Sequence, residues 1–90
     1  MPREARFAKN QDIFREINER IVELAETWGG QEIGIVCECA TMGCAEQIQV
    51  PLAVYHRVRK CPDWFLIKPG HLARDEQMIE RHLGYEIIKV

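Results

Sequence analysis

The sequence contains no serine, and its only threonines are Thr27 and Thr41. Its three histidines are scattered, and it has neither a glycine-rich phosphate loop nor a dinucleotide-binding fingerprint. Nucleophilic and acid–base catalysis need a nucleophile beside a base, or paired carboxylates, and the chain offers few candidates for either. We therefore expect that the protein is not an enzyme.

Long apolar runs are also missing. No stretch approaches the roughly 20 apolar residues of a membrane-spanning helix, and no apolar run follows the charged opening Met1–Arg6. We therefore expect no signal peptide, no membrane contact and a cytoplasmic location. The net charge of −2 and the pI near 5.9 give the whole chain no electrostatic attraction to nucleic acid. One middle segment, residues 55–74, is locally basic, with five lysine and arginine residues against one aspartate.

The size of the chain limits its hydrophobic core. Ninety residues, 47 % of them hydrophobic and 29 % charged, are typical of one soluble globular domain. A chain of this length buries only about 60–65 % of the surface that its unfolded form exposes, so its core is marginal. A structural zinc ion contributes about 10–16 kcal/mol of apparent binding free energy, against a usual net stability of about 5–15 kcal/mol. A bound metal can therefore decide whether such a domain folds.

Three of the four cysteines lie within eight residues, in the segment Cys37-Glu38-Cys39-Ala40-Thr41-Met42-Gly43-Cys44. On an ideal strand Cys37 and Cys39 share one face, and the following loop is long enough to bring Cys44 back to them. Clustered thiolates suit a soft tetrahedral ion such as Zn²⁺, although spacing alone does not separate zinc from iron. In the cytosol, such cysteines are metal-bound more often than disulfide-paired. We predict one zinc ion here.

His71, in the segment Pro69-Gly70-His71, is the first candidate for the fourth ligand. Cys61 is the second candidate, but it ends an apolar helical pattern just before a proline, where a cysteine more often packs than binds. His56 and His82 lie among charged residues on predicted helices, where a solvated histidine is the ordinary case. Water is a further alternative.

A set of three thiolates and one imidazole carries a net charge of −1 when it holds Zn²⁺. Lys68 and Arg74, near His71 in the sequence, are candidates to offset that charge. Because four protein ligands leave no coordination position for a reactive water, we expect the zinc to be structural rather than catalytic.

Hydrophobic spacing predicts a small α+β domain over residues 10–90, in the order α-β-β-α-β-α-β, after a flexible N-terminal arm at 1–9. The predicted helices cover about 11–28, 51–60 and 75–83, and the predicted strands cover 32–37, 46–50, 64–67 and 85–90. The first helix is expected to bury one apolar stripe, formed by Ile13, Phe14, Ile17, Ile21, Leu24, Ala25 and Trp28. The first two strands should form a hairpin with a zinc knuckle at its tip.

The main functional prediction is a zinc-stabilised domain that binds another protein. A possible contact surface follows the second predicted helix and combines basic residues with an aromatic: Arg57, Arg59, Lys60, Trp64 and Lys68. Such residues can hold phosphates and stack a base, which gives nucleic-acid binding as an alternative. A solvated charged face with Trp64 in the core favours a protein partner. A further alternative is a redox- or metal-responsive switch, in which oxidation of the clustered cysteines releases zinc.

The chain also resembles a group of small uncharacterised bacterial proteins from about residue 10 to its end. The resemblance is carried by Cys37-x-Cys39-x4-Cys44, Tyr55-x-x-Val58-Arg59, Pro62, Phe65, Pro69-Gly70-His71, Glu80-Arg81 and Tyr85. It implies that His71, rather than Cys61, completes the zinc site. The chain departs from the group's pattern at Cys61 and Leu72, where the group carries acidic residues, and both departures leave the four ligands intact. The resemblance brings no established activity with it.

Overall fold

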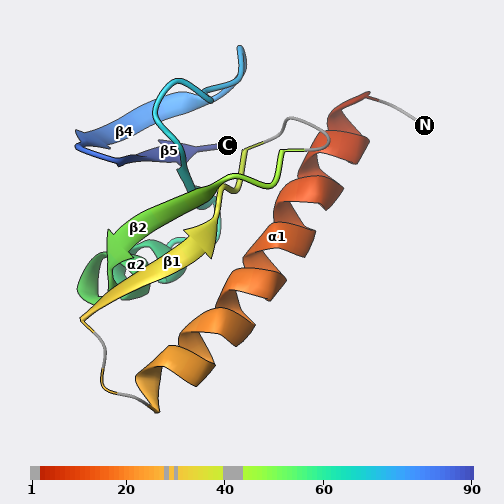
Figure 1. Ribbon diagram of the computed structural model, residues 1–90. Coiled ribbons are helices and arrows are strands. Elements are labelled where there is room, and N and C mark those ends of the chain that lie inside the picture. The colour runs from red at the N-terminus through yellow and green to blue at the C-terminus, as the bar shows by residue number, and fades with distance from the viewer. Residues whose placement is uncertain (1–2, 28, 30, 40–43) are drawn as a thin grey trace.

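A computed structural model describes residues 3–27, 29, 31–39 and 44–90 of the chain. The elements, drawn in Figure 1, are α1 (Arg3–Glu26), β1 (Glu32–Val36), β2 (Gln47–Pro51), α2 (Leu52–Arg59), β3 (Trp64–Ile67), β4 (Gln77–His82) and β5 (Tyr85–Lys89). The predicted α+β class is confirmed. Trp28 and the hairpin tip at 40–43 lie outside the described residues. Within the described part of the chain, no helix is both long and apolar enough to cross a membrane.

Helix α1 begins at Arg3, about two turns before the predicted start near residue 11. Residues 3–9, predicted as an arm, therefore form its first turns. This segment lacks an apolar stripe, but its alanine, arginine, glutamate and lysine residues are all strong helix formers. After the helix, Gly29 adopts a φ of 73°, a left-handed conformation that ends helices and that glycine adopts without strain.

The side of α1 that faces the rest of the protein is partly polar. Gln11, Asn18 and Val22 are buried, and their spacing of seven and four residues places them on one face. Ile21 and Ala25 pack beside this face against the core. Three members of the predicted buried stripe are instead exposed, namely Ile13, Ile17 and Leu24. The apolar spacing alone therefore predicted the wrong burial for three of the six described residues of the stripe.

The five strands form two antiparallel sheets. In the two-stranded sheet, β1 pairs with β2 so that Ile33 lies opposite Val50, and Ile35 lies opposite Ile48. All four side chains are buried in the main core, where β1 is covered by α1 and β2 contacts α2. The other sheet has the order β3-β5-β4. Figure 1 shows α1 running alongside the β1–β2 hairpin, with the second sheet at one end.

Strands β3 and β5 are buried on both faces, because each face of their sheet meets a different apolar cluster. Leu66 and Ile87 are cross-strand partners in the main core. Phe65 and Ile88 are the neighbouring partners, and they point into a second cluster that contains Cys37 and Cys39. The cysteines therefore lie against the opposite face of the sheet from the main core.

The predicted helix at 75–83 is wrong, because this segment forms strand β4. Its three apolar residues fit helical spacing, but residues 77–82 pair with the neighbouring strand β5, with one irregularity in the register between Met78 and Glu80. Gly84, expected to stop a helix, lies in the two-residue turn between β4 and β5 with a φ of 91°. On either side of the turn, the His82 and Tyr85 rings stack with centroids 4.7 Å apart. A left-handed glycine in such a turn is typical of a tight hairpin.

Candidate metal centre

Four potential ligands converge in the second apolar cluster. The Sγ atoms of Cys37, Cys39 and Cys44 and a ring nitrogen of His71 all lie within 4.8 Å of one another. Nδ1 of His71 is 3.5 Å from Sγ of Cys37 and 3.6 Å from Sγ of Cys44. No disulfide joins the cysteines. The cluster is thus the predicted set of ligands, and it can hold a metal ion.

The end of the β1–β2 hairpin positions the cysteines. The backbone N–H of Cys37 donates to the carbonyl of Glu46, 2.7 Å away, and so continues the pairing of β1 with β2 by one step. The N–H of Glu38 donates to the carbonyl of Leu66 at 2.8 Å, which fixes the segment to β3. Cys37 and Cys39 are fully buried, whereas Cys44 is half-buried. The ligands therefore lie on backbone that is held by two different strands.

A tight turn after β3 positions His71. Lys68 begins the turn, and the N–H of His71 donates back to its carbonyl at 3.1 Å. Pro69 occupies the second position and Gly70, with a φ of 89°, the third, which is the residue pattern of a type II turn. The N–H of Gly70 donates to the carboxylate of Glu86 at 3.1 Å, so the turn is also fixed to β5. The Pro-Gly-His motif therefore brings the imidazole back to the cysteines.

Two further groups contact the ligands. The backbone N–H of Lys68 donates to Sγ of Cys37 at 3.1 Å, so Lys68 supports the site as expected, although through its backbone. Nε2 of His71 lies 3.4 Å from a carboxylate oxygen of Glu46, which itself pairs with the Lys68 ammonium at 2.9 Å. This favours the tautomer in which Nε2 carries the proton and Nδ1 offers its lone pair to a metal. Arg74 is exposed.

The protonation of Cys37 depends on whether a cation is present. Burial raises the pKa of its thiol to about 12, and the hydrogen bond from the Lys68 N–H only partly opposes this. Without a metal, Cys37 is therefore protonated at neutral pH. A divalent cation held by this site would bind the thiolate form, so metal binding here would release protons.

Neither the protein-family models nor the curated proteins and solved structures compared with this chain give a significant match. The resemblance to small bacterial proteins therefore stays a prediction. The chemistry of the site itself carries the functional conclusions.

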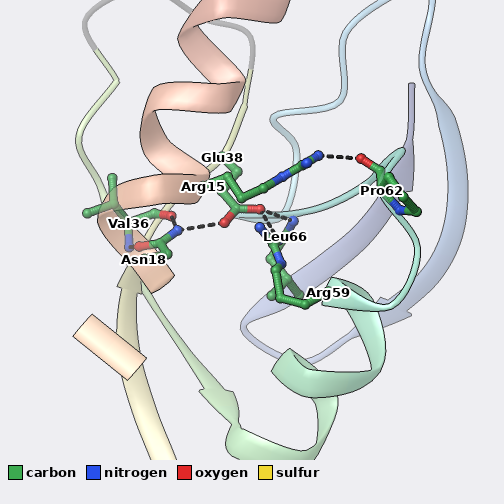
Figure 2. Close-up of polar contacts among 7 residues, drawn as sticks. All are labelled: Arg15, Asn18, Val36, Glu38, Arg59, Pro62 and Leu66. Carbon is green, nitrogen blue, oxygen red and sulfur yellow. Dashed lines mark hydrogen bonds and ion pairs between the residues drawn. The ribbon is translucent and has the colours of Figure 1, made fainter. Parts of the chain in front are cut away.

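A buried ion pair lies directly beside the cysteines. Glu38, between Cys37 and Cys39 in the chain, is fully buried, and its carboxylate accepts hydrogen bonds from three groups: Arg59 Nη2 at 2.6 Å, Asn18 Nδ2 at 2.7 Å and the N–H of Leu66 at 3.0 Å. Figure 2 shows the carboxylate between Asn18 and Arg59. Asn18 also hydrogen-bonds both backbone groups of Val36. This network connects α1, α2 and β3 to the backbone that carries the cysteines.

Most residues of the predicted basic contact surface are engaged within the protein. Arg59 is only 13 % exposed because it pairs with Glu38, and Trp64 packs against the main core. Arg57 pairs with Glu80, and Lys68 pairs with Glu46. Lys60 is exposed. The five residues therefore do not form one open basic surface.

The sequence interpretation missed Glu38, Asn18 and Glu46 as supports of the site. A partial signal exists for Arg59, because it follows Tyr55 by four residues and so shares the buried face of α2 with it. A buried arginine needs a carboxylate partner, and a glutamate between two metal-binding cysteines is a natural candidate. Cys61, the alternative ligand, lies outside the cluster.

Proposed function

We propose that the protein is a small domain stabilised by one structural zinc ion, held by Cys37, Cys39, Cys44 and His71, and that its folded surface binds another protein. Two distances within the cluster fit a tetrahedral ion such as zinc, and all four ligand atoms lie within 4.8 Å of one another. With Zn–S bonds of about 2.3 Å and a Zn–N bond of about 2.0–2.1 Å, a tetrahedral ion separates its sulfur and nitrogen ligands by about 3.6 Å. The two sulfur–nitrogen distances in the cluster are 3.5 Å and 3.6 Å.

The composition of the cluster supports a structural rather than a catalytic role. Catalytic zinc is usually held by three protein ligands and a water, whereas four protein ligands complete a tetrahedron. Cys37 and Cys39 are fully buried, so the site is also poorly placed to receive a substrate. The bound ion would join the end of the β1–β2 hairpin to the turn that follows β3.

A protein partner is favoured over nucleic acid by the way the basic residues are used. Arg57, Arg59 and Lys68 each pair with a glutamate, so their charges are compensated within the protein. Phosphate binding depends on uncompensated Lys and Arg charges that displace counterions. The proposal therefore expects no salt-dependent binding of DNA or RNA.

Metal analysis of cysteine variants tests the zinc site. We expect one zinc ion per chain in the purified protein and in Cys61→Ser, which removes a cysteine outside the cluster. Cys44→Ser, which removes a half-buried cysteine within it, should lose most of the zinc. His71→Ala should weaken zinc retention far more than Cys61→Ala. Equal zinc content in Cys44→Ser and Cys61→Ser would refute the ligand set.

A further inference from the structure

We propose that the outer face of α1 binds an amphipathic helix of a partner protein, in which lysine or arginine residues lie beside the apolar contact residues. This inference rests on the proposed function, because it names the surface and the chemistry of the partner. It begins with three large apolar side chains of α1 that are exposed: Ile13 by 44 %, Ile17 by 41 % and Leu24 by 63 %.

These three side chains form one stripe. They are four and seven residues apart, which places them on the same face of a helix, opposite the buried Asn18 and Val22. Scattered apolar residues are normal on a protein surface, whereas an aligned row marks a contact site. Its spacing is the one with which a helix receives the apolar residues of a second helix.

The charges beside the stripe select the partner. One side of it carries four exposed carboxylates, those of Asp12, Glu16, Glu19 and Glu23. Among the residues whose side chains the structure describes, none of the four takes part in an ion pair, and within residues 11–27 Arg20 is the one basic residue beside the stripe. A helix with apolar residues at matching positions and lysine or arginine beside them would be complementary in both shape and charge.

A second copy of this chain fits less well. Two such helices packed antiparallel would bring the acidic side of one copy against the acidic side of the other, and like charges at matched positions of paired helices repel. Phosphate-bearing partners meet the same repulsion. The carboxylates therefore argue for a basic protein segment from a different chain.

Binding of a synthetic peptide tests this surface in the full-length, zinc-loaded protein. The probe is a fluorescent amphipathic peptide with leucines at helical spacing and lysines beside them, and its counterpart has glutamate at every lysine position. We expect the protein to bind the lysine peptide and not the glutamate peptide. The double variant Ile17→Asp/Leu24→Asp should bind the lysine peptide at least about tenfold more weakly, although its added negative charge alone would strengthen the attraction.

Two control variants separate the stripe from general charge effects. Leu83→Asp makes a similar apolar-to-acidic change at a fully exposed residue of the β4–β5 turn, outside α1. The affinity of this variant for the lysine peptide should match that of the unaltered protein. Glu16→Lys/Glu23→Lys should lose affinity for the lysine peptide and gain affinity for the glutamate peptide.

Three results would overturn the proposal. They are no binding of the lysine peptide at low salt, equal binding by Ile17→Asp/Leu24→Asp and the unaltered protein, or a dimer in sedimentation that this variant abolishes. Zinc content is measured on the same samples. If zinc-loaded protein fails to bind the peptide, only the proposed binding surface is refuted. If zinc-free protein binds the peptide, only the proposed role of zinc in stabilising the fold is refuted.

Discussion

The Glu38 carboxylate is fully buried and accepts three hydrogen bonds, one of them from Arg59. Removing one partner of a buried ion pair leaves the other charge unpaired in a medium of low dielectric constant. Here the remaining charge would be Arg59, whose guanidinium also lies 5.0 Å from the centre of the Tyr55 ring. Glu38 therefore supports the backbone on which Cys37 and Cys39 lie.

Glu38→Gln should lower the free energy of unfolding by about 3–5 kcal/mol, because Arg59 loses its counter-charge while it stays buried. Urea denaturation of the zinc-loaded protein measures this. Arg57→Gln is the matched control, since it breaks the exposed Arg57–Glu80 pair and should cost less than about 1 kcal/mol. A loss for Glu38→Gln no larger than that of the control would contradict the role of the buried pair.

Glu46→Ala should weaken zinc binding by about tenfold without changing the fold, because the His71 ring loses the carboxylate that orients it. The side chain of Glu46 is 49 % exposed, so its removal leaves no cavity. Competition with a chelator of known affinity measures the change. Glu32→Ala, an exposed glutamate at the other end of the hairpin, should keep the original affinity. Equal affinities of the two variants would show that Glu46 does not support the ligand.

At the residue scale, the sequence was sufficient to predict the four residues that converge, but not the residues that support them. The close spacing of Cys37, Cys39 and Cys44 in the sequence indicates a metal site. The position of His71 directly after Pro69-Gly70 makes it the first candidate for the fourth ligand. Glu38 and Glu46 depend on partners that only the tertiary fold brings near, from α1, α2 and the turn after β3. No local pattern contains that information.

At the scale of elements, β4 shows how a short apolar pattern can mislead. Met78 packs into the second cluster and Ile79 against the main core, and consecutive residues on opposite faces are a property of strands. The same two residues, with Leu83, also fit one side of a helix. Pairing with β5 decides between the two, and this pairing is a tertiary contact. The β1–β2 hairpin and β3 were predictable because alternation or a compact apolar run left one interpretation.

Gly84→Ala should destabilise the protein by about 1–2 kcal/mol, since a residue with a Cβ is strained at the left-handed φ of Gly84. Thermal or urea unfolding measures the loss. Leu83→Ala, one residue earlier in the same turn, should have almost no effect because Leu83 is fully exposed. Equal stability of the two variants, or helical amide contacts across residues 77–82 in NMR spectra, would contradict the hairpin.

At the scale of the whole molecule, the four residues of the candidate metal centre lie outside the main core. The main core gathers side chains of α1, β1, β2, α2, β3 and β5, and none of the four ligands belongs to it. Cys37 and Cys39 lie in the smaller cluster on the other face of the second sheet, packed beside Phe65, Ile67 and Ile88. A metal ion there would cross-link the hairpin to that sheet within the smaller of the two apolar clusters.

Removal of the metal should therefore lower the Tm by at least about 15 °C. A ligand present at about 1,000 times its Kd adds about 4 kcal/mol to the free energy of unfolding. Each kcal/mol of that free energy shifts the Tm of a domain this size by about 4–8 °C. Calorimetry with and without a strong chelator measures the shift, and added Zn²⁺ should restore the original transition. An unchanged Tm after complete metal removal would show that packing alone holds the domain together.

X-ray absorption spectroscopy at the zinc edge of the purified protein, combined with its metal content, tests the ligand set most directly. We predict one zinc ion per chain, with three sulfur neighbours at about 2.3 Å and one nitrogen neighbour at about 2.0–2.1 Å. A first shell made only of oxygen and nitrogen, or a folded protein that contains no stoichiometric metal, would contradict the account.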